Sequence, residues 1–496
     1  MVAPELAVVV GYLVLALAVG LVAYRLTAST AEDYYLASRS LGTVVLLFTT
    51  FATLLSAFTF FGGPNLTYGN GPEWTLVMGL MDGVLFAILW YVVGYKQWLL
   101  GRREGYVTLG EMLGERFGST GLRVLVAGVS LFWLVPYVML QQRGAGQAVV
   151  GLTDGAVPYW VGAGGITLFM IAYVVASGMR GVAWTDTLQG VFMLVFIWGA
   201  LAWVLAAVGG PTAATEALAE SNPEFLALGG GVYSPQFVIG TAVYIAFGVT
   251  MFPQINQRFF AADSEAVLKR TFSLWPVLVL LLFVPAFMLG TWAAGLGVVV
   301  PEGGNVVPAA LREFTPAWFA ALVIAGALAA MMSSSDSMLL SGSSYFTRDV
   351  YEPLVGEADR EALLGRAAVV GFALVAFALS LTATRSIVEI GNTAFGGFAQ
   401  LALPVIAALY WPRATRTGML AAVAGAQLFY AGNLVVAVIL GPFDSMGAVG
   451  AAYYLGWHPG IPGMVLSLLL VVGISAVTSR SPGEDAELYF AGQRAD

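Results

Sequence analysis

Long apolar stretches separated by short polar ones run along the whole 496-residue chain. A helix needs about 20 apolar residues to cross a bilayer, and each stretch approaches that length. Glycine and proline mark several of the joints, for example at 209–211 and 301–304. The pattern predicts an all-α polytopic membrane protein with thirteen transmembrane helices. We expect these helices at 5–26, 43–69, 74–100, 121–151, 157–177, 184–208, 236–255, 272–298, 316–347, 364–384, 388–411, 416–441 and 461–478.

The composition supports this class and excludes several functions. Hydrophobic residues make up 59% of the chain and charged residues 10%, whereas a soluble domain has about 25% charged residues. Without cysteine, the chain has no disulfide, thiolate metal site or cysteine nucleophile. No glycine-rich phosphate loop followed by Lys-Ser/Thr occurs, so ATP is not the expected energy source. We expect 4–24 to be a retained helix and His458 to be an ordinary surface residue.

The basic residues predict the orientation of the chain. With thirteen spans, 18 of the 21 lysines and arginines fall in loops on one side. Only Arg312 and Arg385 fall on the other side, and Arg143 lies within a span. Basic loops stay in the cytoplasm. We therefore expect a multi-pass protein of the cell membrane with an extracellular N-terminus and a cytoplasmic C-terminus.

The order of the spans suggests an internal repeat. Spans two to six and seven to eleven form two sets of five, and because five is odd the second set is inverted. Inverted repeats are typical of secondary transporters. We expect a flanking helix and loop (1–42), a first repeat (43–208), an extracellular loop (209–235), an inverted repeat (236–411), two flanking helices (412–478) and a cytoplasmic tail (479–496).

The ninth predicted span carries an unusual ladder of small and hydroxyl side chains. Ala330, Ser333, Ser334, Ser337 and Ser341 share one helical face. Because lipid offers hydroxyls no partner, this face must meet protein, water or an ion. Hydroxyls beside a closely packed backbone suit a hard cation such as sodium. The same serines could instead only pack helices together.

Two other spans carry residues that break helices. Gly62, Gly63 and Pro64 follow a hydroxyl-rich stretch in the second span, where Pro64 leaves the Phe60 carbonyl without its donor. In the seventh span, Gly248 and Pro253 bracket a likely interruption in the same way. Paired interruptions in corresponding helices point to a binding site at the membrane midplane. An ordinary proline kink is the alternative.

Two charged residues within the spans have open roles. Asp186, near the inner edge of the sixth span, could receive a departing cation or could be a charge favoured at a helix start. Arg143 in the fourth span could meet a substrate carboxylate, pair with a protein acid or extend to the interface.

Five motifs spread over the chain resemble those of the solute:sodium symporter family. They are EDYYLASRSLG (32–42), GMRGVAWTDTLQG (178–190), FPQINQRFFAAD (252–263), AAMMSSSDSMLLSGSSYFTRDVY (329–351) and LYWPRATRTG (409–418). Members carry proline, pantothenate, monocarboxylates, sugars, urea or iodide together with sodium. The resemblance implies a LeuT-type core of five plus five inverted helices.

The resemblance also implies particular site residues. The sodium ligands would be the carbonyls of Ala52, Leu55 and Ala330 and the hydroxyls of Ser333 and Ser334, with Asp186 on the release path. The substrate would contact Phe58, Tyr137, Gln141, Ile245, Gly248 and Val249. Proline carriers have an acid at the position of Leu54 and aromatic residues at those of Ile245 and Val249, so we expect a more apolar solute, for example a carboxylate.

The function predicted from these features is sodium-coupled uptake of a small organic solute by alternating access. The expected partners are the solute, sodium and the bilayer, with no nucleic acid. We expect no enzyme, because Asp82, Asp186 and Asp336 are scattered on separate spans. A proton-coupled or sodium-independent transporter of the same fold stays open. A solute sensor is the weaker alternative, since the tail is too short for a signalling module.

Overall fold

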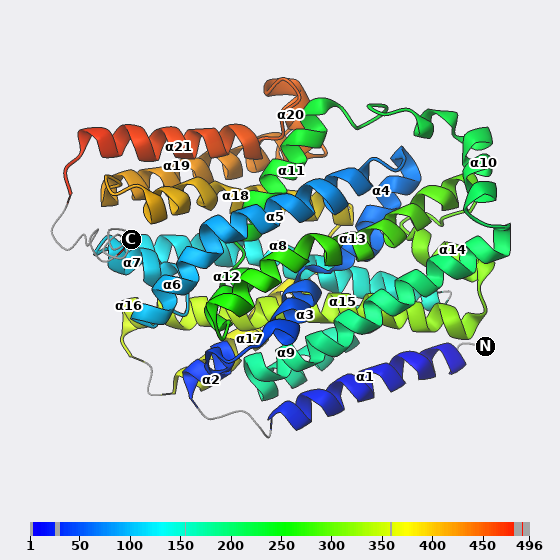
Figure 1. Ribbon diagram of the computed structural model, residues 1–496, viewed down its shortest axis with the longest axis horizontal. Helices are drawn as coiled ribbons and strands as arrows, with labels where there is room; N and C mark the ends of the chain where they lie inside the picture. Colours follow the sequence, from blue (N-terminus) through cyan, green and yellow to red (C-terminus); the bar gives the residue numbers. More distant parts are fainter. Residues whose placement is uncertain (1–2, 25–29, 154, 358–359, 481–488, 490–496) are drawn as a thin grey trace.

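The computed structural model describes the chain except residues 1–2, 25–29, 154, 358–359, 481–488 and 490–496. The described residues form one bundle of long helices that run roughly side by side (Figure 1). Within this part of the chain, the β-type contact is a single bridge between Leu41 and Ala262.

The helices alternate with short connections throughout. The α-helices are α1 (Ala3–Tyr24), α2 (Ala31–Leu36), α3 (Thr43–Leu54), α4 (Gly63–Asn70), α5 (Gly83–Leu89), α6 (Tyr95–Glu104), α7 (Leu109–Arg116), α8 (Thr120–Leu152), α9 (Tyr159–Val208), α10 (Pro211–Ser221), α11 (Pro235–Thr250), α12 (Pro253–Ala261), α13 (Glu265–Gly295), α14 (Val306–Phe314), α15 (Ala317–Ser344), α16 (Glu352–Val355), α17 (Glu361–Ser380), α18 (Ile387–Tyr410), α19 (Arg416–Asn433), α20 (Met446–Tyr453) and α21 (Gly460–Val477). Tighter 3₁₀ turns are η1 (Ala37–Arg39) and η5 (Pro223–Leu226), and wider π-helical turns are η2 (Phe58–Gly62), η3 (Thr75–Asp82), η4 (Trp90–Gly94), η6 (Tyr345–Tyr351) and η7 (Leu434–Ile439).

Helices cover all of the predicted membrane spans. Among the described residues, 9 helices are long and apolar enough to cross a membrane, or 11 if each of two bent pairs counts as one span. Two shorter apolar helical segments, 5–20 and 159–175, lie at the first and fifth predicted spans. Gly178 has a φ of 57° and divides α9 between the fifth and sixth predicted spans. The all-helical class is confirmed, and the count of thirteen spans stays a prediction.

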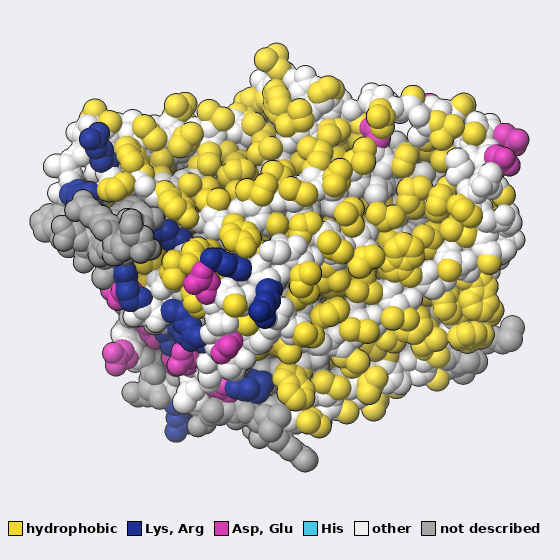
Figure 2. Space-filling model, in the orientation of Figure 1, with side chains coloured by type: hydrophobic (Ala, Val, Ile, Leu, Met, Phe, Trp, Pro, Cys, Tyr) yellow, Lys and Arg dark blue, Asp and Glu magenta, His cyan; other side chains and the backbone are white. Residues whose placement is uncertain are grey.

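Charged and apolar side chains are separated on the surface. Figure 2 shows a broad apolar surface, with lysine, arginine and most of the visible acids gathered at one end. Large hydrophobic residues such as Val14, Phe132 and Leu168 are exposed, which suits contact with lipid. We name the charged end the basic end; α10 and α14 lie at the opposite end (Figure 1).

Two bent helix pairs face the central helix α15. The pair formed by α3 and the segment 58–70 bends by 60°, and the pair formed by α11 and α12 bends by 54°. Helix α15 contacts both α3 and α12, and its residues 320–344 are almost wholly buried. The interruption predicted between Gly248 and Pro253 lies at Met251 and Phe252, as expected.

The other interruption does not lie where Pro64 suggested. The helix opens at Leu55 and Ser56, where Leu55 has an extended backbone (φ −81°, ψ 119°). Pro64 instead lies inside the continuous helical segment 58–70, directly after the π-helical turn η2. A wider π-helical turn can accommodate the missing N–H group of a proline within a helix, so the helix continues past Pro64 and the break lies at Leu55 and Ser56.

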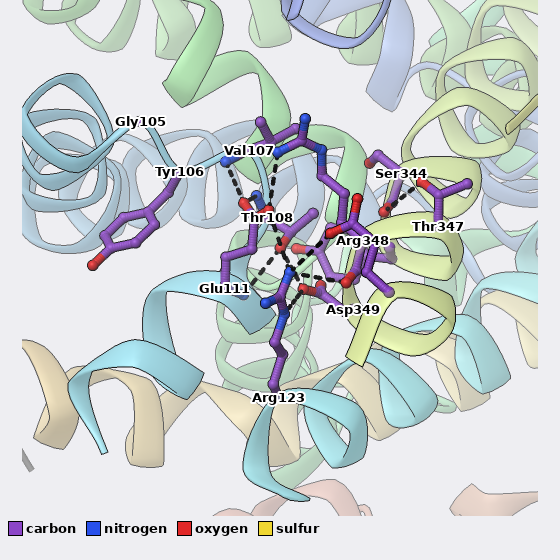
Figure 3. A network of polar contacts seen from close by, with 12 residues as sticks. Gly105, Tyr106, Val107, Thr108, Glu111, Arg123, Ser344, Thr347, Arg348 and Asp349 are labelled. Atoms are coloured by element: carbon purple, nitrogen blue, oxygen red, sulfur yellow. Dashed lines mark hydrogen bonds and ion pairs between the residues drawn. The ribbon is translucent and has the colours of Figure 1, made fainter. Parts of the chain in front are cut away.

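A network of ion pairs, which we call the basic-end network, joins distant segments at the basic end (Figure 3). Arg123 at the start of α8 donates to Asp349 of η6 at 2.9 Å, and Thr108 before α7 donates to the same carboxylate oxygen at 2.9 Å. Arg348 donates to Glu111 of α7 at 3.1 Å and to Glu361 of α17 at 2.8 Å. The network therefore fixes the ends of α8, α15 and α17 to α7.

Candidate ion and solute site

Oxygen atoms of the α3 break converge on two serines of α15. The Ser333 hydroxyl donates to the Ala52 carbonyl at 2.8 Å and to the Ala330 carbonyl at 3.0 Å. The Ser334 hydroxyl donates to the Leu55 carbonyl at 2.7 Å and to the Thr53 carbonyl at 2.9 Å. All of these residues are buried. The structure thus brings together the five predicted ligand residues and adds the Thr53 carbonyl.

The extended backbone at Leu55 explains why the Ala52, Thr53 and Leu55 carbonyls are available. A helical carbonyl normally accepts from an N–H group four residues later. At the break, the serine hydroxyls of α15 take the place of those donors. Hydroxyl oxygens keep lone pairs for a cation when the hydrogen rotates away, and hard cations prefer oxygen ligands. This donor set can hold sodium.

A chain of buried polar side chains continues from this cluster toward Asp186. The carboxylate of Asp186 accepts from Thr49 at 2.6 Å and from Arg258 at 3.1 Å. Arg258 of α12 also donates to Ser337 at 2.5 Å, and Ser337 lies 2.8 Å from the hydroxyl of Thr53. Asp186 is therefore linked to α3, α12 and α15 rather than being a simple charge at a helix start.

Sequence reasoning missed the partnership of Arg258 with Asp186. From the sequence, Arg258 marks only the cytoplasmic end of the seventh predicted span. In the structure its side chain is 1% exposed. The sequence does contain a hint of this pair, because a buried arginine needs an acidic partner and Asp186 is an acid in another span. The distance between the two residues in the sequence hid the pair.

The predicted substrate residues surround an aromatic cluster. Phe58 lies 5.3 Å and Tyr137 5.2 Å from the ring of Phe395 on α18, measured between ring centroids. Gly248 lies against the backbone of Phe395, since a Cβ there would come within 2.3 Å of its carbonyl oxygen. Gln141 accepts from the Ala57 N–H at 2.8 Å. Ile245 and Val249 are buried on α11 beside these residues. Phe395 therefore fills the centre of the predicted site.

Two neighbouring cavities lie farther toward the opposite end. One of about 890 Å³ reaches Gly62, Thr241 and Tyr244, and one of about 980 Å³ reaches Arg312. Arg143 and Gln147 line both. Arg143 donates to the Ala383 carbonyl, and within the described part of the chain it has no acidic partner. Of the three roles open to Arg143, pairing with a protein acid is not found there.

His458 is not the ordinary surface residue that we expected. Its ring stacks on Tyr244 with a centroid distance of 4.3 Å, and the residue lines the 890 Å³ cavity. Burial lowers the pKa of His458 to about 3, so the side chain is neutral near pH 7. The connection between α20 and α21 folds inward here, which the local sequence did not reveal.

The comparisons with known proteins agree with this architecture. The sequence model of the Sodium:solute symporter family matches residues 34–425. The sodium/pantothenate symporter of Escherichia coli is 30% identical over 476 residues, covering 93% of this chain and 94% of the relative. The sodium/proline symporter of the same organism is 27% identical, covering 95% and 93%.

Solved structures share the fold. A Na⁺-coupled sialic acid symporter in a substrate-bound, outward-open state has a TM-score of 0.78 at 20% identity, covering 96% of this chain and 98% of that chain. Mhp1, a nucleobase-cation-symport-1 family transporter in a closed conformation, has a TM-score of 0.58 at 17% identity, covering 92% and 97%.

Fold and relatives together define a multi-pass membrane transporter, not an enzyme. More particularly, the chain belongs to the sodium:solute symporter family, as its motifs predicted. Sodium is the coupling ion of this family.

Proposed function

We propose that this protein uses inward sodium flow to take up a small organic solute. The observation that carries the proposal is the convergence of the Ala52, Leu55 and Ala330 carbonyls on the Ser333 and Ser334 hydroxyls. Sodium would bind among these five oxygens. The concentration of arginine and lysine at the basic end supports a cytoplasmic position for that end, with both cavities on the extracellular side.

Sodium binding and solute binding would be coupled through α3. An ion held between the two serines and the α3 carbonyls fixes the break against α15. Phe58 lies three residues after Leu55 and contacts Phe395, so the ion would also order the solute site. By linkage, solute must tighten sodium binding by the same factor as sodium tightens solute binding.

Alternating access would then involve a movement of the two bent helix pairs relative to the rest of the bundle. Spans two to six and seven to eleven would form the inverted five-helix repeats, with flanking helices outside them. In the present arrangement the aromatic cluster of Phe58, Tyr137 and Phe395 lines neither cavity. The Asp186–Arg258 pair is also buried and lines neither cavity. Sodium leaving toward the cytoplasm would pass Asp186, which requires that this pair loosen.

The solute class that fits best is an organic anion with an apolar body. Arg143 offers a guanidinium to the cavities without an acidic partner in the described chain. A charge at that depth is costly unless something neutralises it. Ile245 and Val249 add apolar surface. Pantothenate, a carboxylate that appears in the names of two relatives, carries the net negative charge that Arg143 would neutralise. It is therefore a better first candidate than proline, which is a zwitterion.

The test is uptake of radiolabelled pantothenate into proteoliposomes under a sodium gradient. We expect sodium-dependent uptake that other carboxylates, but not their amides, inhibit. Arg143→Gln should raise the half-saturating pantothenate concentration about tenfold or more, since a charge-assisted hydrogen bond contributes about 1.5–3 kcal/mol. The matched control Arg270→Gln, on an exposed side chain of α13 that lines neither cavity, should leave it unchanged.

Two results would contradict the proposal separately. Uptake driven by a proton gradient without sodium would contradict sodium coupling. Sodium-driven uptake that neutral solutes inhibit as well as carboxylates do would contradict the anion class alone.

A further inference from the structure

Asp82 is a buried acid that the transport site does not use. It ends the π-helical turn η3, within the helical span 75–104. Its side chain is 0% exposed, and neither carboxyl oxygen has a hydrogen-bond partner among the described residues. The other buried acids of the described chain do have partners: Asp33 has Arg180, Glu73 has the Gly229 N–H, Asp186 has Arg258, Asp336 has Tyr173 and Asp349 has Arg123.

No basic side chain is close enough to neutralise Asp82. The turn η3 packs against α11 and α13. Helix α11 contains no charged residue, and its titratable side chain within electrostatic range of Asp82 is Tyr244.

The charged residues of α13, which are Glu265, Lys269 and Arg270, lie in its first two turns. Gly83, next to Asp82, meets α13 at Pro276 and Val279, about 9–13 Å farther along that helix than Arg270. On the same span as Asp82, the nearest basic residue is Lys96, about 20 Å away along the helix axis.

An ionised carboxylate in these surroundings would be very costly. Moving an unpaired charge out of water costs several kcal/mol or more, and a buried group avoids this cost by becoming neutral. A metal ion would need several oxygen ligands, and no described polar group lies within hydrogen-bond distance of either carboxyl oxygen of Asp82. A proton neutralises the group with a single oxygen.

We propose that Asp82 is a proton-binding site whose carboxyl group is protonated while α11 covers it. The position also suggests how the proton could leave. Tyr244, near Asp82, lines the 890 Å³ cavity, and α11 is one half of a bent pair. A movement of α11 would bring water to the carboxyl group and allow it to ionise. This site is separate from the oxygens proposed to hold sodium.

Infrared difference spectroscopy on the purified full-length protein in lipid tests the proposal without any transported solute. Subtracting the Asp82→Asn spectrum from that of the unmodified protein at pH 7 should leave the C=O stretching band of a carboxylic acid. The control Asp33→Asn should instead remove carboxylate bands, because Asp33 is buried in an ion pair with Arg180. Carboxylate bands in the Asp82→Asn difference would overturn the proposal.

If Asp82→Asn does not fold, Asp82→Glu replaces it in the spectra, and we then expect a shifted carboxylic acid band. The stability of the protein as a function of pH gives a second readout. A proton held in the folded state but lost on unfolding makes the unmodified protein less stable as pH rises above about 4. Relative to Asp82→Asn, its folding equilibrium constant should therefore fall up to tenfold per pH unit. A constant difference in melting temperature from pH 5 to 8 would overturn the proposal.

Discussion

At the scale of single residues, Ser333 and Ser334 connect two helices by their hydroxyl groups alone. Each hydroxyl donates to carbonyls that the helical hydrogen-bond pattern leaves free, and both side chains are 0% exposed. A methyl group in either place would leave those carbonyls without a donor and remove a ligand from the proposed ion site.

Replacing both serines, Ser333→Ala with Ser334→Ala, should abolish the stimulation of uptake by sodium. Two of the five proposed ligands are lost, and the remaining carbonyls no longer face a hydroxyl. The initial rate of uptake as a function of sodium concentration measures this. Ser343→Ala is the matched control, because Ser343 donates within its own helix to Leu340 at 2.7 Å. A double variant with unmodified sodium dependence would show that sodium binds elsewhere.

Asp186→Asn should raise the sodium concentration needed for half-maximal uptake. The change removes the carboxylate on the proposed release path and leaves Arg258 buried without its acidic partner. Breaking a buried pair costs about 3–5 kcal/mol, so the melting temperature should fall as well. Arg258→Gln combined with Asp186→Asn should recover part of the stability, because no buried charge is then left over. An unchanged half-saturating sodium concentration would leave Asp186 a purely structural residue.

At the scale of helices, the two bends differ in how well sequence alone predicts them. Gly248 and Pro253 bracket the bend between α11 and α12, where local chemistry decides the position. The bend after α3 lies at Leu55 and Ser56, because serines of α15 satisfy the carbonyls there. Those partners lie about 280 residues away in the sequence, so Pro64 was a misleading local signal.

The same limit applies to the centre of the solute site. The six substrate residues are predicted from the motifs of a family, and those motifs do not include Phe395 of α18. Its ring lies against Phe58 and Tyr137, and its backbone lies against Gly248. Side-chain packing among helices from both halves of the chain decides that arrangement. Periodicity and motif spacing carry no information about it.

The basic-end network should act as a brace between helices. Arg123→Ala and Asp349→Asn should each lower the melting temperature, since both side chains join η6 to the start of α8. Because Arg123 is 25% exposed, we expect a coupling of about 1–2 kcal/mol in a double-mutant cycle. The exposed pair Arg103–Glu104 provides the control, where Arg103→Ala should change stability by less than about 0.5 kcal/mol. Additive effects of Arg123→Ala and Asp349→Asn would show that the pair does not brace the helices.

At the scale of the whole molecule, the hydrophobic pattern predicts more than any single motif does. The apolar stretches become helices, and the charged loops gather at one end. Both features depend on averages over many residues, so an error in one helix boundary changes neither the predicted fold class nor the predicted charged end. The same charged loops predict which side of the membrane the basic end faces, because basic loops stay in the cytoplasm.

The absence of cysteine from the sequence makes the orientation directly measurable. Ala227→Cys lies on an exposed segment between α10 and α11, and Arg360→Cys lies on an exposed position before α17. Because basic loops remain in the cytoplasm, a membrane-impermeant maleimide should label Ala227→Cys in intact cells and Arg360→Cys only after permeabilisation. Both variants should keep sodium-driven uptake before labelling, since neither position contacts the proposed site. The reverse labelling would place both cavities on the cytoplasmic side, and the proposed direction of solute entry would be wrong.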